Sequence, residues 1–339
     1  MMKDNKKVVY WLLTGCALIF VMVVVGGITR LTNSGLSISN YKLIHGVIPP
    51  MNQQEWVEAF ELYKQYPEYQ KLHYHFNLED FKQIYFWEWI HRVIGRLIGV
   101  VFIIPFLYFL LRKQLSKATI RKASILLALG AFQGFMGWYM VKSGLVDRPS
   151  VSHYRLAAHL MTAFITFAYS FWVALDIIYK NNVKPAVPKM KNWIWAGMIV
   201  LILQITWGAF VAGLDAGFIH NSWPLMTDGK WIHETVYIEL EPVWRNFIAG
   251  KSGVQFVHRY LAWFVVGFIV IIWIKAKKLS LTKPQKNGIN SVLIIVCLQF
   301  LLGIFTLIYQ VPVWLGVTHQ VGAFFLLASM TFILHRFSK

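Results

Sequence analysis

Long apolar runs separated by short polar segments make up most of the chain. A helix that crosses a bilayer needs roughly 20 apolar residues, whereas strands and the helices of soluble proteins use shorter or alternating patterns. Eight runs meet this length, and they predict an all-α integral membrane protein with eight transmembrane helices. The predicted spans are Val8–Ile28, Tyr85–Leu111, Ala123–Val141, Tyr154–Tyr179, Trp193–Gly213, Val254–Ile274, Gly288–Tyr309 and Trp314–Leu334.

Composition agrees with this pattern. Only 14% of the residues are charged and 57% are hydrophobic, whereas soluble domains average about 25% charged residues. The first run is too long for the apolar core of a secretory signal, so we expect it to remain as the first span. No arginine- and serine-rich transit peptide precedes it, which favours a bacterial protein.

The basic residues that give the chain its net charge of +18 lie mainly on one side of the predicted spans. Of the 33 lysines and arginines, 19 lie in the two terminal segments and in the short loops of one parity. Such loops face the cytoplasm, so both termini are predicted to be cytoplasmic in a bacterial cytoplasmic membrane. This distribution orients the chain in a lipid bilayer and gives no reason to expect nucleic-acid binding. The longer segments on the other side, 30–84 and 214–253, are expected to form short helices over the outer face.

The two halves of the chain repeat the same polar residues in the same order. The matching residues are Gly26 and Gly208, His91-Arg92 and His258-Arg259, Gln133 and Gln299, and His159 and His319. Four-helix units commonly hold cofactors, and a parallel repeat implies a pseudo-two-fold axis along the membrane normal. We therefore expect two pseudo-symmetric four-helix bundles, residues 1–181 with the outer loop 30–84 and residues 182–339 with the outer loop 214–253.

Four histidines begin helices that start on the outer side, namely His91, His159, His258 and His319. Within each half the two histidines lie at similar depth, where facing imidazoles can ligate a heme iron axially. Intramembrane histidines are costly and usually functional, although helix packing through backbone hydrogen bonds is the alternative. Arg92 and Arg259, which follow two of the histidines, are candidates to bind heme propionates, or else lipid headgroups.

One residue breaks the symmetry. Glu88 lies three residues before His91 on the same helix face, and the matching position before His258 is Gln255. A carboxylate can accept a proton or stabilise developing positive charge, which an amide cannot do. The first half is therefore predicted to carry the chemistry and the second half a permanent electron-transfer heme. The alternative is that Glu88 is a structural partner of Arg92.

Several stretches together resemble the heme A synthase family. The most distinctive runs from Asn77 to Arg96 and contains Trp87-Glu88-Trp89-Ile90-His91-Arg92. The others are Gly27–Leu36, Gly46–Pro50, Pro67–Lys71, Ala212–Gly217 and Trp223–Met226. The first outer loop has no cysteine pair, so the chain is similar to the cysteine-free branch found in mitochondria and proteobacteria.

The resemblance implies oxidation of the C8 methyl of heme O, through a hydroxymethyl stage, to the formyl group of heme A for terminal oxidases. By this resemblance His91 and His159 ligate or flank the iron of the substrate heme O, and Glu88 is the catalytic carboxylate. His258 and His319 ligate the iron of heme B. The implied partners are heme O synthase (protoheme farnesyltransferase) upstream, terminal oxidase assembly downstream, and an electron carrier that the sequence does not identify.

Other functions remain as alternatives. A di-heme b-type membrane cytochrome would use the four histidines for electron transfer and leave Glu88 without a role. The prenyltransferase that makes heme O requires aspartate clusters for magnesium diphosphate, and the sequence offers none. A transporter is disfavoured because a parallel repeat with paired histidines suits a cofactor better.

Overall fold

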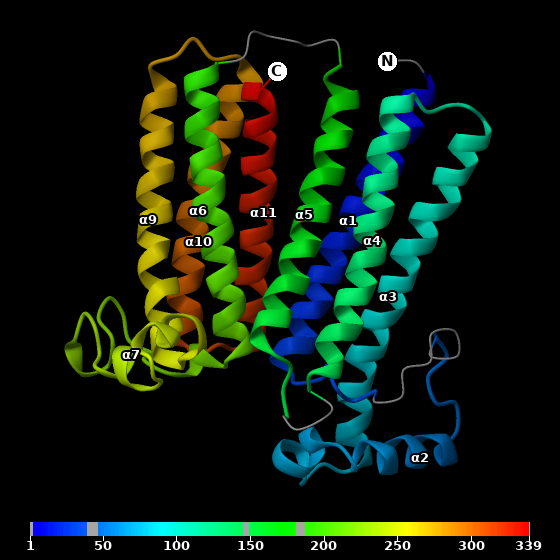
Figure 1. The fold of residues 1–339 in the computed structure, drawn as a ribbon, viewed down its shortest axis with the longest axis vertical. Coiled ribbons are helices and arrows are strands. Elements are labelled where there is room, and N and C mark those ends of the chain that lie inside the picture. The colour runs from blue at the N-terminus through cyan, green and yellow to red at the C-terminus, as the bar shows by residue number, and fades with distance from the viewer. Residues whose placement is uncertain (1–2, 39–46, 145–148, 181–186, 339) are drawn as a thin grey trace. The chain divides into compact units, whose positions relative to one another are not determined.

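The computed structural model describes residues 3–38, 47–144, 149–180 and 187–338, and these form helices and connecting turns without a strand. Eight of the helices are long and apolar enough to cross a membrane, which confirms the eight predicted spans (Figure 1). They are α1 Lys3–Leu31, α3 Leu78–Leu111, α4 Lys117–Lys142, α5 His153–Ile178, α6 Pro188–Gly213, α9 Lys251–Lys277, α10 Lys283–Ile308 and α11 Val313–Ser338.

Several helices begin earlier than the apolar runs because polar residues cap their first turns. Helix α3 starts at Leu78, where the Asn77 side chain accepts hydrogen bonds from the backbone N–H groups of Glu79 and Asp80 at 2.8 and 3.1 Å. The Asp80 carboxylate in turn accepts from the Asn77 N–H at 3.0 Å, which completes a capping box. These polar turns extend α3 about two turns beyond its apolar run.

The chain forms two compact units, one of residues 1–16 with 164–339 and the other of residues 17–163. The predicted boundary between residues 181 and 182 lies outside the described residues, so the division into halves 1–181 and 182–339 stays a prediction. In the first unit α6 and α10 each pack against both α9 and α11, which closes a four-helix ring. Its cytoplasmic half, by the predicted orientation, is filled by buried apolar side chains, among them Ile194, Met198, Ile269, Ile272 and Met330.

In the second unit the outer segment 30–84 forms short helices, as expected. They are α2 Gln53–Tyr63 and the π-helix η2 Tyr69–His73. An aromatic cluster holds them to the first turns of α3, because Phe81 stacks on Phe60 and Tyr63 with ring centroids 5.1 and 5.2 Å apart. This extension lies at the end of α3 where the helix begins (Figure 1).

The outer segment of the first unit folds around one buried asparagine. It contains the short helices η3 Ala216–Phe218, η4 Thr227–Gly229, α7 Thr235–Ile238, η5 Val243–Arg245 and α8 Asn246–Ala249. Asn246 is fully buried, and its side-chain amide donates to the carbonyl oxygens of Tyr237, Leu240 and Val243 at 2.8–3.0 Å. Both α7 and α8 pack against α9, so this segment is fixed at the end of the helix that carries His258.

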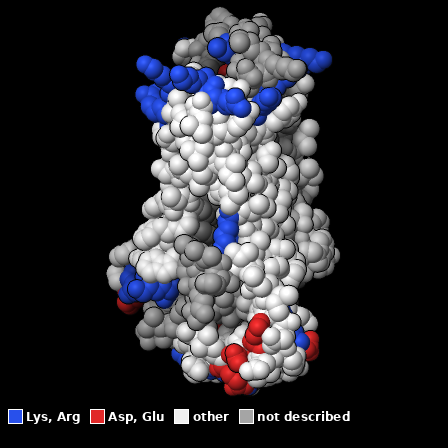
Figure 2. Space-filling model, turned by 90° about the vertical axis from the view of Figure 1, so that its right-hand side faces the viewer, with Lys and Arg blue, Asp and Glu red and all other residues white. Residues whose placement is uncertain are grey.

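Charges gather at the two ends of the helices. On the face in Figure 2, lysine and arginine side chains gather at one end, a mostly uncharged band with a small basic patch inside it follows, and acidic side chains lie near the opposite end beside further basic ones. In the second unit the start of α4 carries Lys117, Arg121 and Lys122, whereas α2 carries Glu55, Glu58 and Glu61. An apolar band between charged ends is what a multi-pass membrane protein requires.

Candidate functional site

The histidines of the second half face each other. His258 of α9 and His319 of α11 have ring centroids 6.4 Å apart and ring planes at 89°. Two imidazoles that share a metal hold it about 2 Å from each nitrogen, which places the ring centres roughly 6 Å apart. The spacing of this pair therefore fits a single metal ion between the rings.

The Nδ1 atoms of this pair are engaged by glutamines. Nδ1 of His258 lies 3.2 Å from the backbone oxygen of Gln204, and the Gln204 amide donates to the His258 carbonyl at 3.0 Å. Nδ1 of His319 lies 3.2 Å from the Gln299 amide nitrogen, which donates to the His319 carbonyl at 2.8 Å. An acceptor at Nδ1, as the Gln204 carbonyl oxygen is for His258, fixes the tautomer and leaves Nε2 free to bind a metal.

A glycine one turn after each glutamine makes room for the imidazole. A Cβ atom at Gly208 or at Gly303 would lie 2.9 Å from Cε1 of His258 or His319, which is closer than carbon atoms approach in ordinary contact. The glutamine and the glycine four residues later lie on one helix face. Each Gln-x-x-x-Gly stretch therefore forms one seat for a histidine ring.

The first half repeats the glycine contacts but differs at both rings. His91 of α3 faces Gly26 of α1, and a Cβ atom at Gly26 would lie 3.0 Å from the ring carbon Cε1. His159 of α5 faces Gly137 of α4, where the corresponding distance would be 3.3 Å. The Gln133 amide donates to the His159 carbonyl at 3.0 Å.

His91 has no glutamine of this kind. The residue one turn before Gly26 is Met22, and Nδ1 of His91 is buried without a hydrogen-bond partner. His159 also leaves its Nδ1 unpaired. The first pair is thus held less firmly than the second.

Glu88 is buried and bound on both carboxylate oxygens. Its Oε2 accepts from the Ser37 hydroxyl and the Ile38 N–H, both at 2.7 Å, and its Oε1 accepts from the Arg92 guanidinium at 2.5 Å. The ion pair with Arg92 that sequence analysis left as an alternative is therefore present. In the second half Gln255 donates to the carbonyl oxygens of Ala216 and Ile219. Glu88 links α3 to the segment after α1 as a hydrogen-bond acceptor. Gln255 links α9 to the segment after α6 as a donor.

The two arginines also differ between the halves, because Arg92 binds a carboxylate and Arg259 binds backbone carbonyl oxygens. Arg92 donates to the Ile38 carbonyl at 2.8 Å and to Glu88. Arg259 donates to the carbonyl oxygens of His220 and Ser222, but its Nε and Nη1 are buried without a partner. Buried N–H groups of a guanidinium cost free energy unless an acceptor meets them. Arg259 is therefore arranged to receive an anionic group such as a carboxylate.

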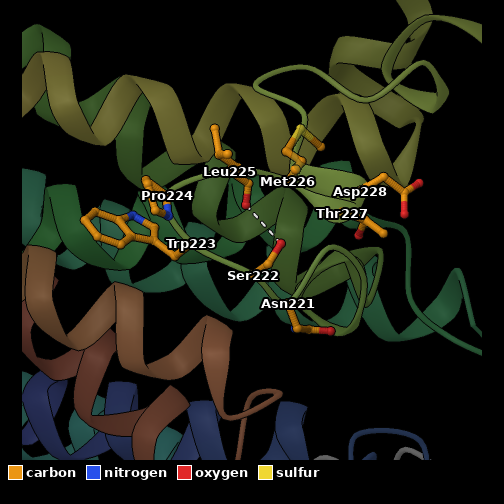
Figure 3. A pocket seen from close by; sticks show the side chains of 9 residues that line it. Asn221, Ser222, Trp223, Pro224, Leu225, Met226, Thr227 and Asp228 are labelled. Atoms are coloured by element: carbon orange, nitrogen blue, oxygen red, sulfur yellow. Dashed lines mark hydrogen bonds between the residues drawn. The ribbon is translucent and has the colours of Figure 1, made fainter.

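Ser222, whose carbonyl accepts from Arg259, is one of the residues 221–229 that line a loop cavity of about 440 Å³. Within it the Ser222 hydroxyl donates to the Leu225 carbonyl at 2.9 Å (Figure 3). Trp223 stacks on Trp263 of α9 with ring centroids 5.8 Å apart. Because Arg259 holds the Ser222 carbonyl, the loop and the start of α9 form one unit at the outer edge of the histidine pair.

The donor set favours a porphyrin over a bare metal ion. Among the described residues no group of three or more histidine, cysteine, aspartate or glutamate side chains could hold a metal. Protein sites for bare ions usually need three or four such ligands, whereas a heme iron needs only the axial ones. Two paired imidazoles with a buried arginine nearby fit a heme with its propionates.

Sequence analysis singles out the four histidines, both arginines and Glu88, whose roles stay predictions, and it does not predict the contacts of the glutamines. In the sequence Gln133 and Gln299 stand out only as matching residues of the repeat, and Gln204 does not stand out. A signal was present, because Gln204 and Gly208 form a third Gln-x-x-x-Gly stretch. The structure shows that this spacing places a glutamine and a glycine against a histidine ring of the neighbouring helix.

Comparisons with known proteins agree with this chemistry. The family model COX15-CtaA, described as cytochrome oxidase assembly protein, matches residues 9–331. The chain is 58% identical to the heme A synthase of Flavobacterium psychrophilum and 56% identical to that of Flavobacterium johnsoniae, over the full length of each. It is 42% identical to the heme A synthase of Nitrosospira multiformis, over 99% of this chain and 94% of the relative.

Proposed function

Because the chain belongs to the heme A synthase family, an oxidoreductase family that converts heme O into heme A, we propose that it oxidises the C8 methyl of heme O. The product of the first stage is the hydroxymethyl group, and the product of the second is the formyl group of heme A. The observation that carries the proposal is a repeated pair of histidine seats with a carboxylate, Glu88, beside only one of them.

The second half is proposed to hold heme B. Three observations support this assignment: the 6.4 Å spacing of His258 and His319, the engagement of both Nδ1 atoms, and the unpaired guanidinium N–H groups of Arg259. His258 and His319 would bind the iron, and Arg259 would bind a propionate. A heme held by these two histidines would supply one-electron transfer.

The first half is proposed to hold heme O between His91 and His159. A substrate must enter and leave, which suits a pair in which only one ring is held by a glutamine. Arg92, the residue after His91, would bind a propionate with the part of its guanidinium that Glu88 and the Ile38 carbonyl do not occupy.

Glu88 is proposed as the group that accepts a proton when the methyl carbon is oxidised. Its hydrogen-bond partners permit this without loss of the surrounding structure. The Ser37 hydroxyl donates to Oε2 now, but a hydroxyl can equally accept from a protonated carboxyl. Arg92 remains on the other oxygen and balances the charge of the ionised form.

The chain is a multi-pass membrane protein, and we propose that both termini face the cytoplasm of a bacterium. The chemistry also defines the neighbouring steps. A farnesyltransferase, heme O synthase, has to supply heme O, and assembly of a terminal oxidase has to consume heme A. A one-electron carrier has to remove the electrons.

The alternative is a di-heme b-type cytochrome, which the repetition of the histidine seats in both halves favours. The two functions differ in what the protein contains when it is made in cells that also produce heme O. We would extract and chromatograph the hemes of the purified protein, and compare wild type with Glu88→Gln and Arg259→Gln. A synthase is expected to yield heme B together with heme O, its hydroxymethyl derivative or heme A.

The Glu88→Gln variant separates binding from chemistry. The amide oxygen can still accept from Ser37 and Ile38, but the amide NH₂ then faces the buried Arg92 guanidinium, so thermal stability and heme content are measured with it and products are counted per bound heme. Loss of a general base lowers the rate by about 10²–10⁴-fold, so the hydroxymethyl and formyl products should nearly disappear. Heme B alone in wild type, even with heme O supplied, supports the cytochrome instead. Normal heme A production by Glu88→Gln would remove Glu88 from the mechanism.

A further inference from the structure

A groove of about 540 Å³ lies between the last turns of α5 and α11 and the first turns of α10 in the first unit, and the proposed function uses none of its residues. By the predicted orientation this end of the helices faces the cytoplasm, and the C-terminus marks it in Figure 1. The groove combines three aromatic rings, those of Phe171, Tyr179 and Phe332, with polar side chains of α10 and α11. Such a mixture of apolar rings and a few polar groups is typical of a ligand site.

The side of the groove that α5 forms is fixed to α11. Nε2 of the fully buried His335 lies 3.0 Å from Oδ1 of Asp176, and the Trp172 ring meets the His335 ring edge-on with centroids 4.9 Å apart. The guanidinium of Arg336 lies 4.0 Å from the centre of the Tyr179 ring, which itself lines the groove. These contacts fix the end of α5 against α11.

Close packing of α10 against α11 forms another side of the groove. A Cβ atom at Gly288 would lie 2.7 Å from Cγ2 of Ile333, so the two helices approach this closely only because position 288 is a glycine. About one turn earlier, the Gln285 side chain donates to the Arg336 carbonyl at 2.9 Å. The groove is therefore a shaped feature between helix ends that are attached to one another.

A stripe of polar side chains runs along α10 in this groove. Lys283, Asn287 and Ser291 are spaced four residues apart, which places them on one face of the helix. Ser329 of α11 also lines the groove. Within the described part of the chain none of these four side chains makes a hydrogen bond or an ion pair, and neither does the Tyr179 hydroxyl. All five groups can donate, so a ligand with several acceptor oxygens would satisfy them.

The stripe crosses the boundary of the hydrocarbon layer. The apolar run of α10 begins at Gly288. At about 1.5 Å per residue, Lys283 lies about 7.5 Å outside this run and Ser291 about 4.5 Å inside it. A hydroxyl without a partner inside a bilayer costs free energy, because no water is present to bond with it. The ligand therefore needs acceptors both at the level of the lipid headgroups and just below that level.

The charge of this region favours an anion. Residues 275–286 contain five lysines and no acidic residue, and the Asp176 carboxylate of α5 is engaged by His335. Basic pockets between transmembrane helices on the cytoplasmic side bind anionic lipid headgroups. A glycerophospholipid has ester carbonyl oxygens below its phosphate and acyl chains below those. Its acceptor oxygens thus follow the same order in depth as the donors of the stripe.

We propose that this groove binds one anionic glycerophospholipid, with its phosphate at Lys283, its ester carbonyls at Asn287 and Ser291, and its acyl chains along Phe171 and Phe332. The bound lipid joins the end of α5 to α10 and α11 and stabilises this end of the unit. The proposal does not depend on the proposed function, since no residue of either heme site lines the groove.

The test compares Lys283→Gln with Lys286→Gln. Each variant loses one exposed lysine near the start of α10, but only Lys283 lines the groove. General attraction of anionic lipid to a basic surface should fall equally in both variants, whereas a specific site is affected in only one. We would remove lipid from the full-length protein in mild detergent and add phosphatidylglycerol or phosphatidylcholine with the same acyl chains. Bound lipid is counted by native mass spectrometry, and the melting temperature is measured in parallel.

Wild type is expected to bind one phosphatidylglycerol at least about fivefold more tightly than phosphatidylcholine, since one lysine near the membrane surface contributes about that factor. Its melting temperature should rise more with phosphatidylglycerol. Lys283→Gln should lose this preference, and Lys286→Gln should keep it. Ser291→Ala, which removes a hydroxyl donor without changing the charge, should weaken binding of both lipids about 2- to 10-fold.

Equal binding of the two lipids by wild type would overturn the proposal, and so would a Lys286→Gln variant that loses as much phosphatidylglycerol as Lys283→Gln. Two further outcomes would show a different occupant of the groove and would also overturn it. One is a co-purified quinone that phosphatidylglycerol does not displace, and the other is an oligomer of the chain that Lys283→Gln dissociates.

Discussion

Replacing Gly208 with alanine tests whether the second histidine pair depends on the close approach of α6 and α9. A Cβ atom at position 208 would lie 2.9 Å from Cε1 and 3.5 Å from Nδ1 of His258. Ordinary carbon contacts are about 3.5–4.0 Å, so the ring has to move by roughly 0.6 Å or more. That movement disturbs the 3.2 Å contact between Nδ1 and the Gln204 carbonyl. Overpacking of this kind costs about 1–3 kcal/mol, which corresponds to heme binding weakened about 5- to 150-fold.

The assay is the heme B content of the purified protein, followed by titration with heme B and inspection of the low-spin absorption spectrum. Gly267→Ala is the matched control in α9, and Gly134→Ala is a second control in α4, because a Cβ at either glycine meets nothing within 4 Å. Both controls are expected to keep their heme. A Gly208→Ala protein with full heme content and an unchanged spectrum would refute the idea that this glycine seats the ligand.

Three further substitutions probe neighbouring features. Arg259→Gln removes a buried charged donor worth about 1.5–3 kcal/mol, so heme B should dissociate at least about tenfold faster in a transfer assay to apomyoglobin, and an unchanged rate would contradict propionate binding. Gln204→Leu removes the side-chain bond to the His258 backbone and should broaden the orientation of the axial imidazole in electron paramagnetic resonance, whereas an unaltered spectrum would show that the backbone contact suffices. For Glu68, burial raises the pKa in the folded protein from the ordinary 4.5 to about 8, so the folded state binds more protons than the unfolded state between these values. Stability should therefore fall as pH rises through this window, and Glu68→Gln should flatten that decline in thermal denaturation.

Hydropathy predicted all eight spans because lipid imposes an apolar surface on every crossing helix. It could not predict where α3 begins, since the first turns of that helix are polar and belong to the outer extension. There the capping box of Asn77 and Asp80 sets the start, and those two residues are visible in the sequence only as a local motif. The apolar pattern thus reports the membrane-facing part of a helix, not its length.

The histidines could be predicted because a repeated polar residue in an apolar span has few structural explanations. Their seats could not, since a Gln-x-x-x-Gly stretch acquires its role only through the neighbouring helix that it faces. The hydrogen bonds of Tyr63 with Glu68 and His73 are not predicted either. Glu68 and His73 are five residues apart, a spacing that matches the π-helix at 69–73 rather than the α-helical or strand periods.

The two halves differ in a way that suits one scaffold to two tasks. Three of the four histidines receive a glutamine one turn from their glycine, and the exception, His91, has Met22 at that place. A heme that transfers electrons needs fixed axial ligands to keep its potential constant, whereas a substrate heme has to be released after oxidation. The unbraced ring lies in the same half as the carboxylate Glu88, and the doubly braced pair lies in the half that has Gln255. The less constrained ring and the proposed proton acceptor therefore coincide in one half, which is the combination that the proposed turnover of a bound heme requires.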